Sequence, residues 1–220
     1  MSRPSARTQI LSRLYKNAGA IAPYTPEAAH WSPPALSPAK RINRFVELME
    51  AVRSEVYRVK GNAWVDALRK LLQTRELATL AYGKKTWCGD LLEKSWAAKP
   101  HPTNLIPWTQ DIEEFRDELF GISAGITTTM GGIAEAAAMI LWPTPEEPRL
   151  LSLVPPVHIA LVKASEIYTS FPEALKKLDW AKKAPTNSLL ISGPSKTADI
   201  ELILQFGVHG PTDLIVFLIE

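Results

Sequence analysis

A short segment, residues 192–197, combines hydroxyl groups, a glycine and a lysine in the order Ser-Gly-Pro-Ser-Lys-Thr. It follows an apolar run that predicts a buried strand and precedes Asp199 and Glu201, acidic residues that are typical of the first turn of a helix. We therefore expect a helix over residues 197–205, whose first N–H groups are free to bind an anion. The predicted cradle for an anion or phosphate consists of Ser192, Gly193, Ser195, Lys196 and Thr197.

The same residue types also suit an ordinary helix start. There a serine or threonine caps the first turn, and acidic side chains interact favourably with the helix dipole. The segment lacks the GxxxxGK[ST] spacing of a Walker A loop, so ATP hydrolysis is not predicted. Anion binding and simple capping are both left open by the sequence.

A second candidate, His209, lies between Gly207 and Gly210. A histidine can carry protons near neutral pH, although in such a turn it can also bind a backbone carbonyl or the end of a helix. In a strand–helix–strand unit, this turn and the 192–197 turn lie at opposite edges of the sheet. We therefore expect that His209 and Lys196 do not share a site within one such unit.

The metal-ligating residues are few and scattered. The chain has one cysteine, Cys88, which excludes an intrachain disulfide and an iron–sulfur cluster held by thiolates of this chain alone. Its four histidines show neither HxH nor HExxH spacing, so no metal site is predicted. Cys88 can act as a nucleophile, but a free cysteine is more often a small core residue.

Composition indicates an ordinary globular protein. Of 220 residues, 46% are hydrophobic and 22% are charged, with a formal net charge of +2. This balance gives no electrostatic footprint for nucleic acid or an anionic membrane. No stretch approaches the roughly 20 apolar residues that span a bilayer, and residues 1–20 lack the apolar centre of a signal peptide. We expect a cytoplasmic protein.

The first 60 residues predict two helices joined by an extended arm. Apolar residues favour a helix over 5–17, and prolines between 23 and 38 exclude a helix interior or a central strand. Steps of three and four between apolar residues predict a helix over 40–60, and Asn62 can cap the next one. We place an N-terminal helical arm over 1–60 and an α/β domain over 61–220.

The rest of the chain alternates short apolar runs with helical stretches. This alternation predicts an α/β fold with a largely parallel sheet flanked by helices. The expected strands are residues 77–82, 137–142, 157–162, 188–192 and 214–218, and residues 120–125 are expected to form a strand or a turn. The expected helices include 87–97 and 167–178.

Two blocks of sequence resemble a known family. Ser-Gly-Pro-Ser-Lys-Thr-Ala-Asp-Ile-Glu over 192–201 and Gly-Val-His-Gly-Pro over 207–211 resemble the C-terminal signature of the LUD family, of the LutC/YkgG type. Gly-Ile-Thr over 125–127, Ile-Ala-Glu over 133–135 and the segment 148–159 resemble its central block, in the same order. The resemblance is specific over about residues 120–220.

This resemblance implies a fold similar to the NagB/RpiA/CoA-transferase-like group. It also implies a role beside iron–sulfur subunits in the oxidation of L-lactate to pyruvate. The clusters are then expected in the partner subunits, with no cofactor bound by this chain alone. Whether the chain is an enzyme by itself, and whether it forms a homo-oligomer, is left open.

The central block departs from the family pattern. Three alanines, residues 136–138, replace the usual Thr/Ser-Gly-Thr, and Met130 stands where an acid is frequent, but Glu135 is kept. In similar CoA transferases a glutamate accepts the acyl group, so Glu135 is a candidate catalytic residue. His209, which can carry a proton, is the other candidate. Glu135 can instead cap a helix or pair with Arg149. Arg149 can bind a carboxylate such as lactate, or pair with Glu146 or Glu147 at the surface.

Three functions follow from these observations. The first is an accessory subunit of lactate oxidation, which rests on the resemblance. The second is a protein that binds or transfers a phosphate, a nucleotide or a CoA compound at the 192–197 segment, with Glu135 and Arg149 nearby. The third is a protein-interaction module that uses the N-terminal Pro/Trp arm, because tryptophan is enriched at interface hot spots.

Overall fold

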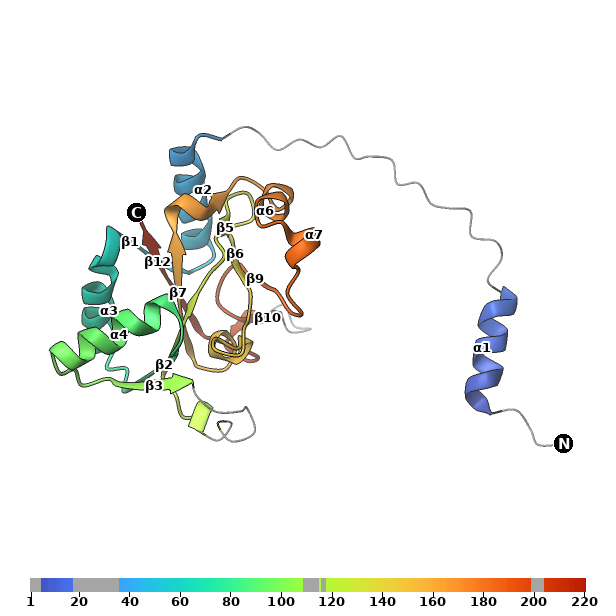
Figure 1. The fold of residues 1–220 in the computed structure, drawn as a ribbon, viewed down its shortest axis with the longest axis horizontal. Coiled ribbons are helices and arrows are strands. Elements are labelled where there is room, and N and C mark those ends of the chain that lie inside the picture. Colours follow the sequence, from blue (N-terminus) through green and yellow to red (C-terminus); the bar gives the residue numbers. More distant parts are fainter. Residues whose placement is uncertain (1–4, 18–35, 109–114, 116–117, 199–203) are drawn as a thin grey trace. The chain divides into compact units, whose positions relative to one another are not determined.

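The computed structural model describes residues 5–17, 36–108, 115, 118–198 and 204–220 (Figure 1). The chain divides into two units, residues 1–33 and residues 34–220. The first contains helix α1 (Ala6–Asn17), which the sequence predicts. The second contains the sheets. Our expected domain boundary at residue 61 stays a prediction, whereas the compact unit that holds the sheets begins at Pro34.

The centre of the second unit is a six-stranded sheet in the order β1-β12-β7-β4-β2-β3. All its pairings are parallel, as predicted. The strands with buried centres have continuous apolar sequences, as expected for a parallel sheet that is covered on both faces. Its strands are β1 (Glu55–Val59), β2 (Thr79–Gly83), β3 (Asn104–Trp108), β4 (Ala124–Thr128), β7 (Val157–Lys163) and β12 (Asp213–Ile219).

One face of this sheet is covered by α3 (Trp64–Thr74), which follows the 3-10 turn η1 (Gly61–Ala63), and by α4 (Trp87–Ala98). Trp64 and Leu68 of α3 and Leu92 of α4 pack with the side chains of alternate strand residues, among them Ile126 and Ile159. Figure 1 shows these two helices together on one side of the strands.

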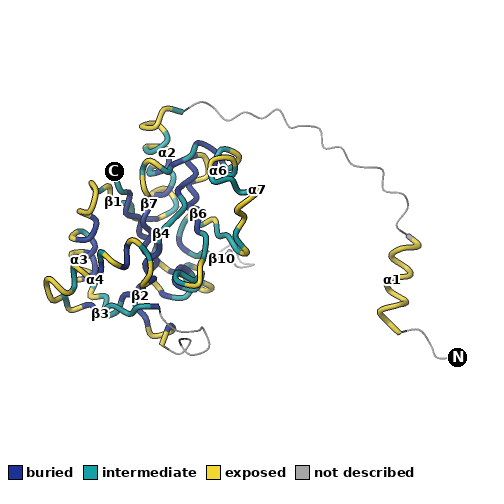
Figure 2. Tube along the Cα trace, in the orientation of Figure 1, coloured by how far each residue is buried: buried dark blue, intermediate teal, exposed yellow. Residues whose placement is uncertain are grey.

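The opposite face is covered by α2 (Pro38–Ala51) and by a second sheet in the order β8-β5-β6-β9. Phe45 and Met49 of α2 and Met139 of the second sheet pack on Val162 and Val216 of the parallel sheet. The inner strands of both sheets therefore form the buried interior of this unit (Figure 2). The second sheet consists of β5 (Gly132–Ile133), β6 (Ala138–Leu141), β8 (Ile167–Tyr168) and β9 (Leu189–Ile191).

The remaining described helices are short. They are η2 (Arg149–Ser152), η3 (Ala164–Glu166), α6 (Phe171–Lys177) and α7 (Trp180–Lys183). The helix predicted over 167–178 begins only at Phe171, because Ser170 caps it and the preceding residues pair as β8.

The helix predicted over 40–60 is wrong in its second half. Helix α2 ends at Ala51, Arg53 adopts a positive φ of 69°, and the chain then continues as edge strand β1 beside β12. Val56 and Val59 satisfy a helical spacing, but they pack on opposite faces of the sheet. Valine favours strands because of its β-branch, and pairing with β12 decides the outcome.

Thr86 fixes the start of α4. Its hydroxyl accepts a hydrogen bond from Gly89 N at 3.1 Å and donates one to Gly83 O at 2.7 Å. We expect Thr86→Ala to lower the free energy of unfolding by about 1–2 kcal/mol, measured by urea denaturation. Ser165→Ala, at an exposed position of η3, is the control and should change it by less than about 0.5 kcal/mol. Equal midpoints for Thr86→Ala and the wild type would contradict the capping role.

Candidate functional site

The segments that carry the family resemblance meet at one place in the fold. Ser195 N donates to Pro211 O at 2.8 Å, and Gly207 N donates to Ser195 O at 2.9 Å. Thr212 Oγ1 donates to Pro156 O at 2.9 Å. Residues from near 156, 195 and 211 are thereby held together although they are far apart in the sequence.

Two glycines shape this junction. Gly193 has a φ of 148° and would place a Cβ 3.2 Å from the Val52 side chain, and Gly207 has a φ of 75° and would place one 2.1 Å from Thr212 Cγ2. An L side chain at Gly207 would therefore be strained by the backbone conformation and would overlap the Thr212 side chain.

The junction surrounds a cavity of about 130 Å³ between the two sheets. His158 of β7 and Leu214 of β12 belong to the parallel sheet, and both lie near the amino ends of their strands, while Ile191 belongs to β9. The polar residues that line the cavity are Ser152, His158, Ser195 and His209, and the apolar ones are Leu153, Ile191, Pro211 and Leu214.

His158 is the buried histidine of this cavity. It is 1% exposed, and its Nε2 lies 2.8 Å from the hydroxyl of Thr127 on the neighbouring strand. Burial lowers the pKa of His158 to about 3, so the ring is neutral at physiological pH. We did not select His158 from the sequence, although it falls within the 148–159 segment of the family resemblance.

The exposed histidine of the cavity is His209, which we selected from the sequence. Our expectation that its turn lies at the opposite edge of the sheet from the 192–197 turn is wrong. His209 lines the same cavity as Gly193 and Ser195. The reason is that β10 (Lys196–Ala198) and β11 (Leu204–Phe206) form an antiparallel hairpin, which returns the chain to its starting point.

The same hairpin overturns the predicted helix over 197–205 in its described residues, and with it the cradle of free helix N–H groups. Asp199 and Glu201 lie outside the described residues. Ser192 and Lys196 are exposed, and Thr197 is half-buried in β10. Of the five residues predicted for the cradle, the structure brings Gly193 and Ser195 to the cavity.

Glu135 lies in a different place. Its Oε1 accepts a hydrogen bond from Phe171 N at 3.3 Å, at the start of α6, which matches the capping alternative. It lines an open groove of about 490 Å³ together with Lys40 and Arg44 of α2. Arg149, at the start of η2, is exposed, and no ion pair joins it to Glu135 in the part of the chain that the structure describes.

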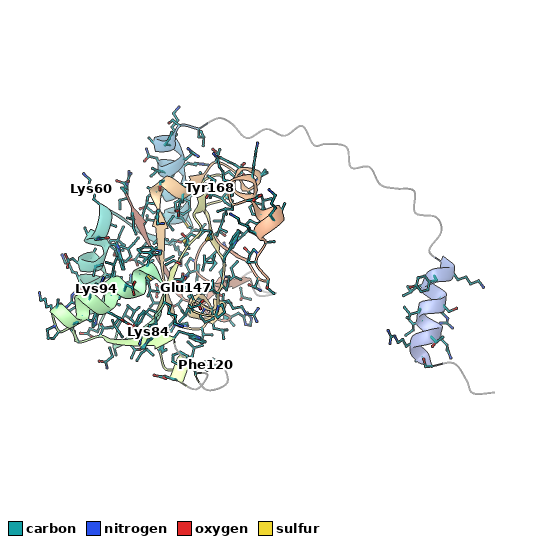
Figure 3. The ribbon with its side chains drawn as sticks, viewed as in Figure 1. Lys60, Lys84, Lys94, Phe120, Glu147 and Tyr168 are labelled. Atoms are coloured by element: carbon teal, nitrogen blue, oxygen red, sulfur yellow. The ribbon has the colours of Figure 1, made fainter. Side chains whose placement is uncertain are left out.

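The suggestion that Glu147 pairs with Arg149 at the surface is also wrong. Glu147 is mostly buried, and its carboxylate accepts hydrogen bonds from Thr128 N at 2.6 Å and from the Thr128 hydroxyl at 3.1 Å. Its Cβ lies 3.2 Å from where a Cβ of Gly83 would be. Glu147 therefore lies over the carboxyl ends of β2 and β4, near the middle of the domain as viewed in Figure 3.

Burial raises the pKa of Glu147 to about 7, against the opposing effect of the hydrogen bonds from Thr128. A carboxyl with this pKa is partly protonated at neutral pH and can give or accept a proton. It lines a hollow of about 10 Å³ with Thr127, Trp142 and Ser152, which is about the space that one water molecule needs. Ser152 lines both this hollow and the larger cavity.

Cys88 is a buried residue of α4. Burial raises the pKa of its thiol to about 12, so it stays protonated and is a poor nucleophile. Among the described residues, no group of three or more His, Cys, Asp or Glu side chains can hold a metal ion. None of the described helices is both long and apolar enough to cross a membrane.

Comparisons with known proteins agree with this architecture. A family model described as "LUD domain" matches residues 42–219. A solved structure of a DUF162 family protein from Deinococcus radiodurans has a similar fold, with a TM-score of 0.64 at 20% sequence identity, covering 84% of this chain and 100% of that one.

Two relatives extend over nearly the whole chain. An uncharacterized protein of Neisseria meningitidis serogroup B is 34% identical over 98% of this chain and 94% of its own length. A protein of Exiguobacterium named "Lactate utilization protein C" is 26% identical over 93% of this chain and 92% of its own length. With most of its length matched by the family model, this chain belongs to the LUD domain family.

Proposed function

We propose that this chain is a cytoplasmic component of a bacterial lactate utilisation system, in which L-lactate is oxidised to pyruvate together with iron–sulfur partner proteins. The observation that supports it is the similarity to a protein named "Lactate utilization protein C", which extends over 93% of this chain and 92% of that relative. The similarity is thus one of whole proteins rather than of a shared segment.

The chemistry of the chain fits an accessory role. Oxidation of lactate to pyruvate releases two electrons, and an iron–sulfur cluster that accepts them is commonly held by four thiolates. This chain has one thiol, that of Cys88, which is buried and has a raised pKa. The electrons are therefore expected to pass to partner proteins.

A second function, binding of a small molecule, is favoured by the cavity between the sheets. Two histidines and two serines line it, and they come from segments that carry the family resemblance. Its volume of about 130 Å³ is below the roughly 300–1,000 Å³ of pockets for drug-sized ligands, which argues against a whole nucleotide or CoA.

The Pro/Trp arm predicted for partner contact lies largely outside the described residues, over 18–35, but a third function, contact with a protein partner, is also favoured by helix α1. Ile10, Leu14 and Tyr15 of this helix are each more than half exposed, and Arg7 and Arg13 add positive charge. We propose that this helix contributes to partner binding. It would then complement the proposed lactate role rather than compete with it.

Growth on lactate tests the proposed function. We expect deletion of the gene, in its own bacterium lacking any other L-lactate dehydrogenase, to abolish growth on L-lactate and to leave growth on pyruvate unchanged. A plasmid copy should restore growth. Copurification of iron–sulfur proteins with the tagged full-length chain tests the partner assignment. Normal growth of the deletion strain on L-lactate would overturn the proposal.

A further inference from the structure

The cavity between the two sheets is lined by side chains of two kinds. Leu153, Ile191 and Leu214 are apolar, whereas His158, Ser195 and His209 provide hydrogen-bonding groups, and His158 and Leu214 are neighbours on paired strands. Pockets of this kind fix a ligand by a few polar groups while apolar side chains enclose the rest of it. The matching ligand combines a small apolar group with a compact set of oxygen atoms.

The size of the cavity restricts that ligand further. On the measure by which one water molecule needs about 10–15 Å³, a cavity of about 130 Å³ has room for roughly ten water-sized groups, which is ample for a molecule of about half a dozen non-hydrogen atoms. A three-carbon acid that carries an oxygen on its second carbon has this size. Its methyl group is the apolar end, and its oxygen atoms form the polar one.

The polar residues of the lining offer a group for each oxygen of such an acid. Among the described residues, none hydrogen-bonds the side chain of Ser195 or His209, so both are free to bind a carboxylate. The ring of His158 is held through Nε2 by Thr127, which leaves Nδ1 for the ligand's second oxygen. Since burial keeps this ring neutral, it can donate or accept that hydrogen bond without adding charge to the cavity.

We infer that this cavity is a binding site for a small 2-hydroxy or 2-oxo carboxylic acid. Ser195 and His209 bind the carboxylate, His158 binds the 2-oxygen, and the methyl group packs on Leu153, Ile191 and Leu214. The inference rests on the proposed function for the choice of acid, because lactate and pyruvate are the two members of this class in that reaction. It concerns binding, and the electrons of the reaction are left to the partner proteins.

Calorimetric titration of the purified full-length chain with L-lactate, pyruvate and propionate tests this site. Propionate has the same carbon skeleton as lactate but lacks the 2-oxygen. We expect L-lactate or pyruvate to bind, propionate to bind about tenfold more weakly, and Ser195→Ala and His209→Ala each to weaken binding about tenfold, as for the loss of one hydrogen bond to a charged group. Ser165→Ala, an exposed serine of η3, should bind as the wild type does.

Two results would overturn the inference: no binding of either acid at millimolar concentrations, or binding that Ser195→Ala and His209→Ala leave unchanged. The growth experiment separates these failures from failure of the proposed function. Loss of growth on L-lactate without binding at the cavity refutes the site alone. Binding that depends on Ser195 and His209, together with normal growth of the deletion strain, supports the site and refutes the lactate role.

Discussion

Replacing Gly125 with alanine is expected to lower the free energy of unfolding by more than about 3 kcal/mol, or to prevent folding. A Cβ at this position would lie 2.1 Å from Leu151 O and 3.1 Å from Leu151 C. Both are backbone atoms, so no side-chain rotation relieves the overlap. Gly125 also pairs with Ala81 on one side and His158 on the other, which prevents β4 from moving away.

Equilibrium unfolding in urea, followed by tryptophan fluorescence, measures this effect. Gly121→Ala is the matched control, because Gly121 is exposed and a Cβ there would meet only Glu118 O at 3.4 Å. We expect the control to change the free energy of unfolding by less than about 0.5 kcal/mol. A Gly125→Ala protein with the wild-type midpoint would show that η2 is free to shift.

Gly125 also explains part of the sequence resemblance in physical terms. It begins the Gly-Ile-Thr stretch over 125–127, and its lack of a side chain lets η2 approach the sheet. Helix η2 in turn contributes Ser152 to the wall of the cavity, and Thr127 holds His158. The stretch therefore positions the cavity by packing and by a hydrogen bond, without itself touching a ligand.

The strands of the parallel sheet show what could be predicted from the sequence. Continuous apolar runs predicted strands over 157–162 and 214–218, and the structure has β7 and β12 there. Buried parallel strands need such runs on both faces, so the signal is local. Strand β1 was missed because its valines also fit a helical spacing, and only pairing with β12 distinguishes the two.

The candidate site was less predictable, because it depends on how distant segments meet. Ser195 and His209 were both identified, but serine, threonine and acidic residues suggested a helix where the described residues form a hairpin. A helix between them would have placed Ser195 and His209 at opposite edges of the sheet, so that error hid their shared cavity. Glu147 was missed because Pro143, Pro145 and Pro148 surround it, and such a segment predicts an exposed loop. Its burial results from the fold of this segment over β2 and β4.

The second large effect concerns this buried carboxyl. Replacing Glu147 with glutamine is expected to remove a loss of stability that the wild type suffers between about pH 4.5 and 7. The folded state holds the proton up to a pKa of about 7, whereas an unfolded glutamate releases it near 4.5. The unfolded state alone is therefore ionised in this interval, and the free energy of unfolding falls as the pH rises.

The difference between these two pKa values sets an upper bound of about 3 kcal/mol on the free energy of unfolding that Glu147→Gln gains. The gain is complete above pH 7. His158 acts in the opposite direction: its pKa is lowered from 6.5 to about 3, so it destabilises the fold as the pH falls below 6.5. In the wild type the two dependences partly cancel between pH 4.5 and 6.5. Glu147→Gln should keep the pH dependence that comes from His158. The free energy of unfolding should therefore rise more steeply with pH than in the wild type.

Urea unfolding at intervals from pH 5 to 8 tests this, since urea does not screen charges as guanidinium does. Glutamine can still accept from Thr128 N and donate to the Thr128 hydroxyl, so Glu147→Gln should fold and exceed the wild-type stability above pH 7. Glu146→Gln alters the adjacent carboxyl and should follow the wild-type profile. Parallel profiles for Glu147→Gln and the wild type would mean that Glu147 is already ionised in the folded state at pH 5. Its position over β2 and β4 would then be that of a permanent negative charge, with no proton to give at neutral pH.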